Sequence, residues 1–155
     1  MIGTFLSFYF YFFLKAKIQT SAFAEFTESF LQYLIKAELG LLEARLEYEN
    51  TLKKIDKFDV VLLSMGEDGH IASLFPNHVY PEEQAVVVEN NSPKSPKQRI
   101  SMSYQQLNKA HYIFKLIIGE SKQQAVYLLQ KDTSLPITKV IGEYDKLYFC
   151  KNAIC

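Results

Sequence analysis

The residues best suited to chemistry lie in one loop, Ser64–Pro76, which carries two carboxylates and a histidine among glycines. The loop follows the apolar run Val60–Leu63, which is typical of a buried strand. In open α/β sheets, ligands bind in the crevice outside the carboxyl ends of the strands. His70 suits a general base that makes water nucleophilic, and Asp68 is close enough in sequence to orient its ring. The alternative for any lone loop histidine is a bond to the backbone.

This loop resembles the signature Gly-x-Gly-Glu-Asp-Gly-His-Thr-Ala-Ser-Leu-Phe-Pro of the 6-phosphogluconolactonases. The resemblance extends over further motifs, from roughly Leu41 to the C-terminus. These motifs are Ala44, Tyr48-Glu49, Phe58-Asp59, Ser92–Ser101, Leu107-Asn108 and Ile118–Lys122. The family hydrolyses a sugar-phosphate lactone in the oxidative pentose phosphate pathway and is related in fold to glucosamine-6-phosphate deaminases. The resemblance therefore implies an α/β lactonase whose partner is that small molecule and which needs no metal or cofactor.

The resemblance also implies roles for the residues of the loop. His70 matches the general base of the family, and Asp68 would hold its ring in the useful tautomer. Gly66 and Glu67 are assigned to substrate binding, although Glu67 is also suited to a structural role in which it accepts backbone N–H bonds. Ser64 replaces a glycine of the family pattern, so its Cβ would strain the loop if the backbone there needs positive φ.

Two cations are expected to bind the phosphate of the substrate. Lys122 follows Gly119 in a strand-to-helix turn, where free N–H groups and the helix dipole favour an anion. Lys122 matches the phosphate-binding lysine of the family, and the alternative is an ordinary surface lysine. Arg99 aligns with a family arginine and is a second phosphate ligand or a solvated edge arginine. We expect Lys94 and Lys97 to lie in a solvated loop.

Residues 1–40 depart from the family pattern. Full-length members carry a Ser-Gly-Gly-x-Thr-Pro phosphate loop and then an Asp-Glu-Arg motif, and neither motif occurs in this sequence. We therefore divide the chain into a divergent, aromatic-rich segment with a helix at residues 1–40 and a lactonase-like α/β domain at residues 41–155. The lack of the phosphate loop predicts impaired activity.

Two other functions stay open. An amino-sugar-phosphate isomerase or deaminase shares the string Asp-Gly-His-Ile-Ala, and Ile71 fits it better than the lactonase threonine. That family continues Phe-Asn-Glu-Pro, whereas this chain has Ser73–Pro76 and no carboxylate there, which favours the lactonase. A non-catalytic remnant, or a module that only binds sugar phosphates, is the third reading.

Composition narrows the partners further. Seventeen basic and 17 acidic residues give a formal net charge of zero, which argues against a nucleic-acid binder. The cysteines, Cys150 and Cys155, indicate a reducing cytoplasm, and the scattered histidines do not have metal-ligand spacing. The aromatic run Phe5–Leu14 is too short to span a bilayer, which takes about 20 apolar residues. We expect a cytoplasmic protein without a membrane anchor.

Hydrophobic periodicity predicts the elements that must position these residues. Strands are expected at Asp59–Met65, Ala85–Glu89, His111–Ile118 and Lys146–Cys150, and helices at Thr20–Lys36, Leu41–Ile55 and Glu120–Gln130. The alternation of helices with apolar strands indicates an α/β fold with a mainly parallel sheet flanked by helices, in a partial doubly wound, Rossmann-like arrangement.

Three finer expectations follow from these elements. The strand His111–Ile118 should be central, and Ala125, Leu128 and Leu129 should face the sheet. His111 is expected to be structural, while His78 has no partner that the sequence identifies. His70 and Lys122 both follow apolar strands, so they should approach one cleft at the carboxyl edge of the sheet.

Overall fold

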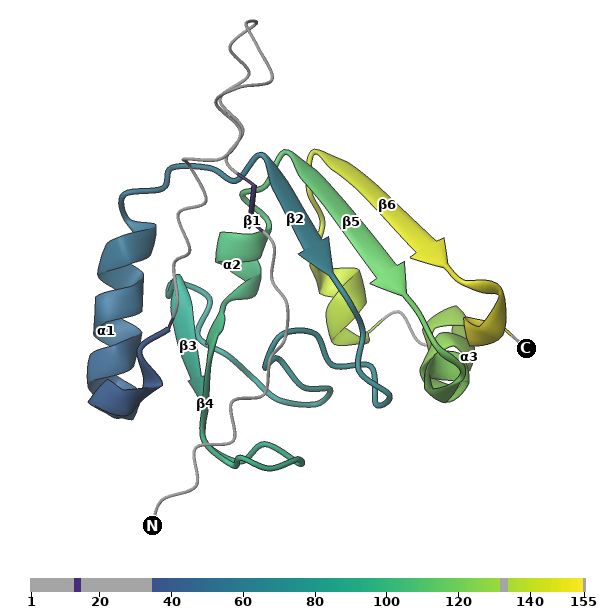
Figure 1. Cartoon of the computed structure of the whole chain (residues 1–155), viewed down its shortest axis with the longest axis horizontal. Helices are drawn as coiled ribbons and strands as arrows, with labels where there is room; N and C mark the ends of the chain where they lie inside the picture. Colours follow the sequence, from purple (N-terminus) through teal and green to yellow (C-terminus); the bar gives the residue numbers. More distant parts are fainter. Residues whose placement is uncertain (1–12, 15–34, 132–133, 155) are drawn as a thin grey trace, which may run out of the picture.

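The computed structural model describes residues 13–14, 35–131 and 134–154 of the 155-residue chain. Within these residues the main sheet has the strand order β1–β2–β5–β6 (Figure 1). Its strands are β1 (Phe13–Leu14), β2 (Val60–Leu63), β5 (Tyr112–Ile117) and β6 (Tyr144–Phe149). Strands β2, β5 and β6 run parallel, and β1 pairs antiparallel with β2.

The central strand β5 shows how the sheet acquires its core face. Ile113, Lys115 and Ile117 alternate with half-buried or exposed residues and are themselves buried. The same alternation buries Val61 and Leu63 in β2. Period-two burial is what a pleated strand produces, so these side chains share one face of the sheet. The prediction that the strand His111–Ile118 is central is confirmed.

A second, smaller sheet lies beside the first. Its strands, β3 (Val86–Glu89) and β4 (Arg99–Met102), pair antiparallel. Helix α1 (Leu41–Leu52) contacts both strands and buries Ala44, Tyr48 and Leu52, which recur every four residues along one face. The strand predicted at Ala85–Glu89 is therefore present, but it belongs to this antiparallel pair and not to the parallel sheet.

The remaining helices follow the later strands. Helix α2 (Tyr104–Leu107) begins at Ser103, whose hydroxyl accepts a bond from the backbone N–H of Gln106, as N-cap serines do. Helix α3 is Gln123–Lys131, and it lies beside the end of β6 in Figure 1. The 3₁₀ helices are η1 (Ala37–Leu39), η2 (Glu120–Lys122), η3 (Pro136–Lys139) and η4 (Lys151–Ala153).

The α/β class and the mainly parallel sheet agree with the sequence-based prediction, but one helix face does not. In α3, Ala125 is buried and Leu129 packs half-buried against the core as expected, whereas Leu128 is exposed and Val126 is buried in its place. Helix α3 packs against η2 and η4. Most of the helix predicted at Thr20–Lys36 lies outside the described residues. Among the described residues, no helix has the length and hydropathy needed to cross a bilayer.

Candidate active site at the carboxyl edge of the sheet

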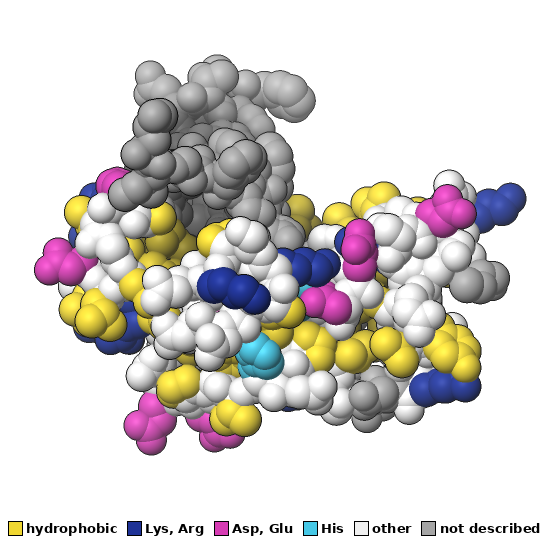
Figure 2. Space-filling model, turned by 90° about the horizontal axis from the view of Figure 1, so that it is seen from below, with side chains coloured by type: hydrophobic (Ala, Val, Ile, Leu, Met, Phe, Trp, Pro, Cys, Tyr) yellow, Lys and Arg dark blue, Asp and Glu magenta, His cyan; other side chains and the backbone are white. Residues whose placement is uncertain are grey.

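The two candidate loops leave the main sheet at the same edge. The His70 loop, Ser64–Pro76, follows β2, and the Lys122 turn, Gly119–Lys122, follows β5. Strands β2 and β5 are parallel neighbours in register from Val60 opposite Tyr112 to Leu63 opposite Lys115. Figure 2 views the molecule from this side, where basic, acidic and histidine side chains gather near the middle of the face.

His70 and Asp68 form a hydrogen-bonded pair inside the loop. Nδ1 of His70 bonds Oδ1 of Asp68, and the same oxygen accepts the backbone N–H of His70 at 3.4 Å. The His70 side chain is 2% exposed, while that of Asp68 is 33% exposed. Because Asp68 engages Nδ1, any proton exchanged with a water molecule must pass through Nε2. The predicted orientation of the imidazole by Asp68 is thus present as a contact.

Gly66 lets the imidazole lie directly against the backbone. A Cβ on Gly66 would stand 2.1 Å from both Cε1 and Nδ1 of His70, so no larger residue fits without moving the ring. The turn is closed by bonds from Gly66 N–H to the His70 carbonyl at 2.7 Å and from Gly69 N–H to the Gly66 carbonyl at 3.1 Å. Gly69 has φ +86°, a conformation that favours glycine. The two glycines therefore fix the position of His70.

Ser64 does not strain this loop. The non-glycine residues with positive φ in the described part of the chain are Ala72 and Asn77. Ser64 is exposed and lies outside the left-handed region. The expected strain from a serine in place of the family's glycine is therefore wrong, because the backbone at this position does not need positive φ.

The ring of Phe75 contacts both the imidazole of His70 and the guanidinium of Arg99. The ring of Phe75, which is 1% exposed, lies 4.8 Å from the His70 ring between centroids. The guanidinium of Arg99 lies 5.4 Å from the centroid of Phe75. A cation above an aromatic face is attracted by the ring quadrupole. Phe75 thus connects a β4 residue to the imidazole.

Burial and nearby charge keep His70 neutral. Burial is the largest influence and holds the pKa of His70 below its usual 6.5, and Asp68 opposes this shift. The positive charges of Lys94 and Arg99 act in the same direction as burial. For Asp68, burial favours the neutral acid, but the hydrogen bonds and attraction of His70 are together stronger and hold its pKa below 3.8. The pair is therefore a neutral base beside a carboxylate at neutral pH.

Arg99 is not the solvated edge residue offered as one alternative. It is 9% exposed. Its Nε donates to the carbonyl of Pro96 at 3.0 Å, and Nη2 donates to the carbonyls of Lys94 and Ser95 at 3.1 and 3.0 Å. Arg99 therefore ties the β3–β4 connection to the Phe75 ring. Its assignment to the substrate phosphate stays a prediction.

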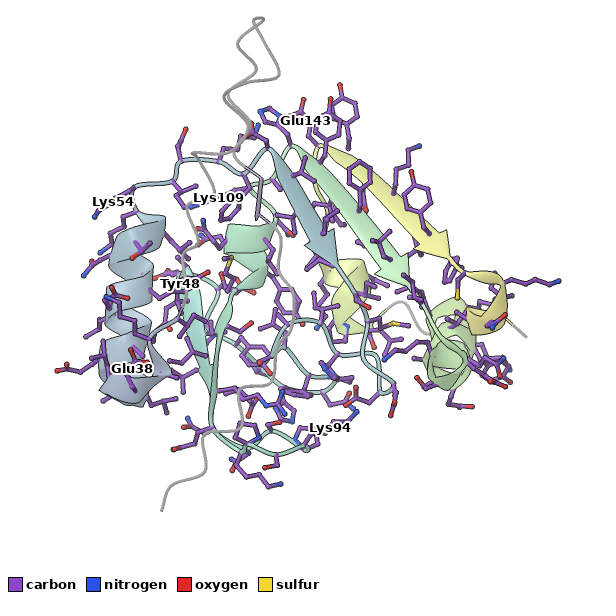
Figure 3. The ribbon with its side chains drawn as sticks, in the orientation of Figure 1. Glu38, Tyr48, Lys54, Lys94, Lys109 and Glu143 are labelled. Atoms are coloured by element: carbon purple, nitrogen blue, oxygen red, sulfur yellow. The ribbon has the colours of Figure 1, made fainter. Side chains whose placement is uncertain are left out.

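Lys94 was expected only to lie in a solvated loop, but it also acts on the candidate site. Its side chain is 42% exposed, yet its charge reaches His70, and its Nζ lies 3.8 Å from Oε2 of Glu67. Figure 3 shows Lys94 at the carboxyl end of the strands and Glu143 at the opposite end. Glu67, 59% exposed, faces this lysine, and within the described residues it accepts no backbone N–H bond. The backbone N–H bonds expected for a structural role of Glu67 are thus not among its described contacts, and its assignment to substrate binding stays a prediction.

Lys122 ends the 3₁₀ helix η2 and is half-buried. Its Nζ has no ion-pair partner in the described part of the chain. Two of the N–H groups expected to be free at this turn are used: Gly119 donates to Sγ of Cys150 at 3.2 Å, and Lys122 donates to the Gly119 carbonyl at 3.1 Å. The side chain, more than the turn, is the group available to an anion.

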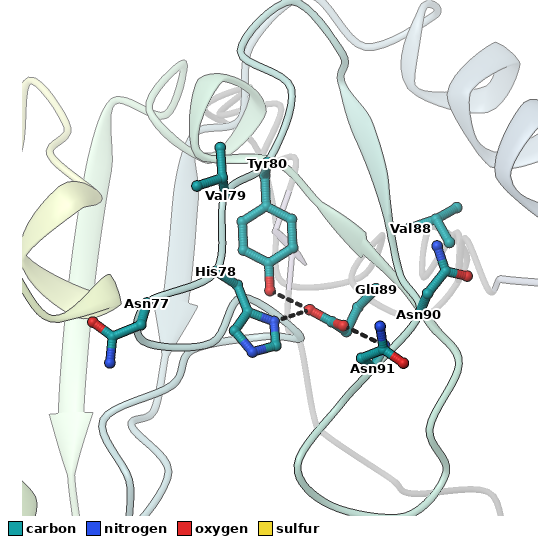
Figure 4. A pocket seen from close by; sticks show the side chains of 8 residues that line it. All are labelled: Asn77, His78, Val79, Tyr80, Val88, Glu89, Asn90 and Asn91. Carbon is teal, nitrogen blue, oxygen red and sulfur yellow. Dashed lines mark hydrogen bonds and ion pairs between the residues drawn. The ribbon is translucent and has the colours of Figure 1, made fainter.

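A second histidine–carboxylate contact lies beside the His70 loop. His78 Nδ1 and the Tyr80 hydroxyl each lie 2.6 Å from Oε2 of Glu89, which is 4% exposed (Figure 4). These three residues line a pocket of about 360 Å³ with Asn77, Val79, Val88, Asn90 and Asn91. No sequence signal reveals this Glu89 cluster, because Glu89 is on a strand and the other two are in a loop. His70 does not line the pocket.

The described residues form no metal-binding cluster, and His111 makes a separate contact with Glu143. No three His, Cys, Asp or Glu side chains there are close enough together to hold a metal ion. His111, expected to be structural, lies at the start of β5, and its Nδ1 is 2.7 Å from Oε2 of Glu143. The chemistry that this edge can perform is therefore that of a neutral imidazole, its carboxylate and nearby cations.

Comparison with known proteins adds an independent observation. The family described as glucosamine-6-phosphate isomerases/6-phosphogluconolactonase matches residues 13–149. The match begins well ahead of Leu41, where the motif resemblance starts. "6-Phosphogluconolactonase 3, chloroplastic" of Arabidopsis thaliana is 33% identical over 132 residues, which cover 74% of this chain and 41% of that protein. The human 6-phosphogluconolactonase is 32% identical over 124 residues, 73% of this chain and 48% of that protein.

Solved structures of the same family have a similar fold. The 6-phosphogluconolactonase of Thermotoga maritima superposes with a TM-score of 0.66 and 31% identity over 74% of this chain and 53% of that one. A monomeric glucosamine-6-phosphate deaminase superposes with a TM-score of 0.59 at 24% identity, which reflects the shared fold alone. The chain thus spans about half the length of the proteins it matches.

Proposed function

We propose that this chain, which belongs to the glucosamine-6-phosphate isomerase/6-phosphogluconolactonase family, hydrolyses 6-phospho-D-glucono-1,5-lactone to 6-phosphogluconate. The observation that carries the proposal is the neutral His70, held by Asp68 at the carboxyl edge of the sheet with two cations close by. Hydrolysis of an ester carbonyl needs a base that is neutral near pH 7, and a dianionic phosphate needs positive charge.

The proposed reaction adds one water molecule to the lactone. Nε2 of His70 takes a proton from water as its oxygen bonds to the carbonyl carbon C1, and Asp68 stabilises the imidazolium that forms. The bond between C1 and the ring oxygen then breaks, and the ring oxygen receives the proton from His70. The ring opens to a carboxylic acid and a hydroxyl, which are the groups of 6-phosphogluconate.

Three cations support binding of the phosphate in this scheme. Lys122 has no ion-pair partner among the described residues, and Lys94 and Arg99 already place positive charge near His70. We propose that Lys122 is the main phosphate ligand and that it faces the same cleft as His70. Arg99 contributes its charge while its donors hold the β3–β4 connection.

The amino-sugar-phosphate isomerase or deaminase reading is not favoured. That reaction needs a ring-opening carboxylate at the position where this chain has Ser73–Pro76. In the structure this stretch packs Phe75 against His70 and presents no acid. A hydrophobic ring cannot exchange a proton with the substrate, so Ser73–Pro76 supplies no acid for ring opening.

Two parallel assays test the proposal. Purified chain is mixed with the lactone, and 6-phosphogluconate is followed by coupled oxidation above the spontaneous rate. The same chain is mixed with glucosamine 6-phosphate, and ammonia release is followed. We expect acceleration of the first reaction only. Ammonia release without lactone hydrolysis would overturn the proposal in favour of the deaminase.

The place of action is a separate proposal. The two cysteines, which do not form the framework of a disulfide-rich secreted protein, support a cytoplasmic protein. The Arabidopsis relative is named as chloroplastic, so the two compartments are the outcomes to separate. A fluorescent fusion of the full chain that collects in an organelle would contradict the cytoplasmic location.

A further inference from the structure

A continuous set of contacts joins the Glu89 cluster to the imidazole of His70. The Tyr80 hydroxyl lies 2.6 Å from Oε2 of Glu89 and accepts the backbone N–H of Phe75 at 2.9 Å. A phenol has one hydrogen, and the close, charged acceptor is Glu89, so the Ser73 carbonyl at 3.3 Å is the weaker alternative. Tyr80 therefore holds the backbone of the residue whose ring packs on His70.

The far end of this connection is itself fixed. Glu89 is 4% exposed, and both of its oxygens are used: Oε2 by Tyr80 and His78, and Oε1 by the backbone N–H of Asn91 at 2.6 Å. Burial alone would raise the pKa of Glu89, but its hydrogen bonds with Tyr80, Asn91 and His78 are together stronger and lower it. A buried carboxylate with every oxygen bonded is a rigid point from which to hold a loop.

We propose that Tyr80 and Glu89 are positioning residues of the active site, which hold the Phe75 ring against His70 and so keep the general base buried and correctly directed. The inference rests on the proposed function for its catalytic consequence, but the placement of the imidazole is measurable without any substrate. It adds residues of β3 and of the stretch after Pro76 to a site otherwise built on the His70 loop.

The pKa of His70 is the quantity to measure, because it would not change if Tyr80 only stabilised the fold. The charged groups that face His70 are Asp68 from its own loop, Lys94 from the β3–β4 connection and Arg99 from β4. Within the described residues, the hydroxyl of Tyr80 bonds Phe75, Ser73 and Glu89 and none of these three charged groups. If Tyr80 no longer holds Phe75, water reaches the imidazole, and the pKa of His70 rises towards 6.5 because burial is what lowers it.

The test compares two neighbouring tyrosines, of which only Tyr80 has a hydroxyl that bonds Glu89 and Phe75. Tyr80→Phe removes the hydroxyl that bonds Glu89 and Phe75. Tyr104→Phe is the matched control, because its ring lies 6.4 Å from that of Tyr80 and its buried hydroxyl has no hydrogen-bond partner. Proton NMR titration of the three histidines gives the pKa of His70, and His111 at the opposite edge of the sheet reports an intact fold.

We expect Tyr80→Phe to raise the pKa of His70 and to lower kcat for the lactone roughly ten- to a hundredfold with little change in KM. Tyr104→Phe should leave both quantities unchanged. Glu89→Gln should act like Tyr80→Phe, whereas Glu143→Gln should not, although Glu143 also contacts a histidine, His111, at 2.7 Å.

The two proposals fail in different ways. An unchanged His70 titration in Tyr80→Phe, or an equal change in Tyr104→Phe, overturns the positioning role whatever the chain catalyses. A shifted His70 titration supports it even if neither the native chain nor the variant hydrolyses the lactone, and that lack of hydrolysis would count against the proposed function alone.

Discussion

At the scale of single residues, the site depends on how closely the imidazole is enclosed. The backbone of Gly66 lies against the His70 ring and Phe75 packs nearby, so the proposed general base is 2% exposed. The contact of His70 with Asp68 was predictable from the sequence, because the two residues are close together in one glycine-containing loop after an apolar strand, whereas the role of His70 as the base stays a prediction. The contact between Glu67 and Lys94 was not predictable, because it joins two loops that are far apart in the sequence.

Gly66→Ala tests this enclosure. The new Cβ would overlap the imidazole, which stands 2.1 Å away, so the ring must turn away from Asp68. A displacement of about 1 Å at a reacting group can cost roughly a hundredfold in rate, and we expect kcat to fall by that order. Steady-state kinetics with Ser64→Ala, an exposed position in the same loop, as control should show the contrast. Equal activities would mean that the ring position is not limiting.

The pH profile follows from the lowered pKa of His70. The base must be neutral, so activity is present above its pKa and is lost as the pH falls through it. Since burial, Lys94 and Arg99 hold that pKa below 6.5, the acid limb of kcat/KM should have its midpoint below pH 6.5. Values of kcat/KM measured from about pH 4.5 to about pH 8 give this midpoint. A midpoint above 6.5 would contradict the account of His70.

At the scale of elements, the parallel order of β2, β5 and β6 brings two loops to one edge. Strands β2 and β5 were predictable, because strands inside a parallel sheet form nearly continuous apolar runs. Strand β6 has mixed residues and is mostly exposed, so its sequence carries a weaker signal. The pairing of β3 with β4 was not predictable, because a short strand does not reveal which neighbour it will join. The exposure of Leu128 in α3 was not predictable for a similar reason, because periodicity does not show which neighbours, here η2 and η4, pack against the helix.

Lys122→Ala tests whether the turn after β5 serves the phosphate. Loss of this cation should raise KM for the phosphorylated lactone with a smaller effect on kcat, and the defect should shrink on unphosphorylated gluconolactone. Lys131→Ala, at the other end of α3, is the control, and initial rates at varied substrate concentration give both constants. A defect of the same size on both lactones would show that Lys122 does not bind phosphate.

At the scale of the whole molecule, the chain spans less than half of each of two curated relatives. It spans 41% of the Arabidopsis relative and 48% of the human one, and its sequence lacks the family's Ser-Gly-Gly-x-Thr-Pro loop. Catalysis by the chain should therefore be weaker than that of the full-length human relative, by about a hundredfold if the lactone is less firmly oriented. Parallel assays of the two purified proteins measure this ratio, and equal kcat/KM values would contradict it.

The most direct measurement is lactone hydrolysis by the native chain and by His70→Ala at the same high protein concentration, with His111→Ala as the control at the opposite edge. Loss of a general base costs about 10²–10⁴-fold, so His70→Ala should fall to the spontaneous rate while the native chain and His111→Ala stay above it. Hydrolysis by His70→Ala as fast as by the native chain would contradict the central claim that His70 activates the water.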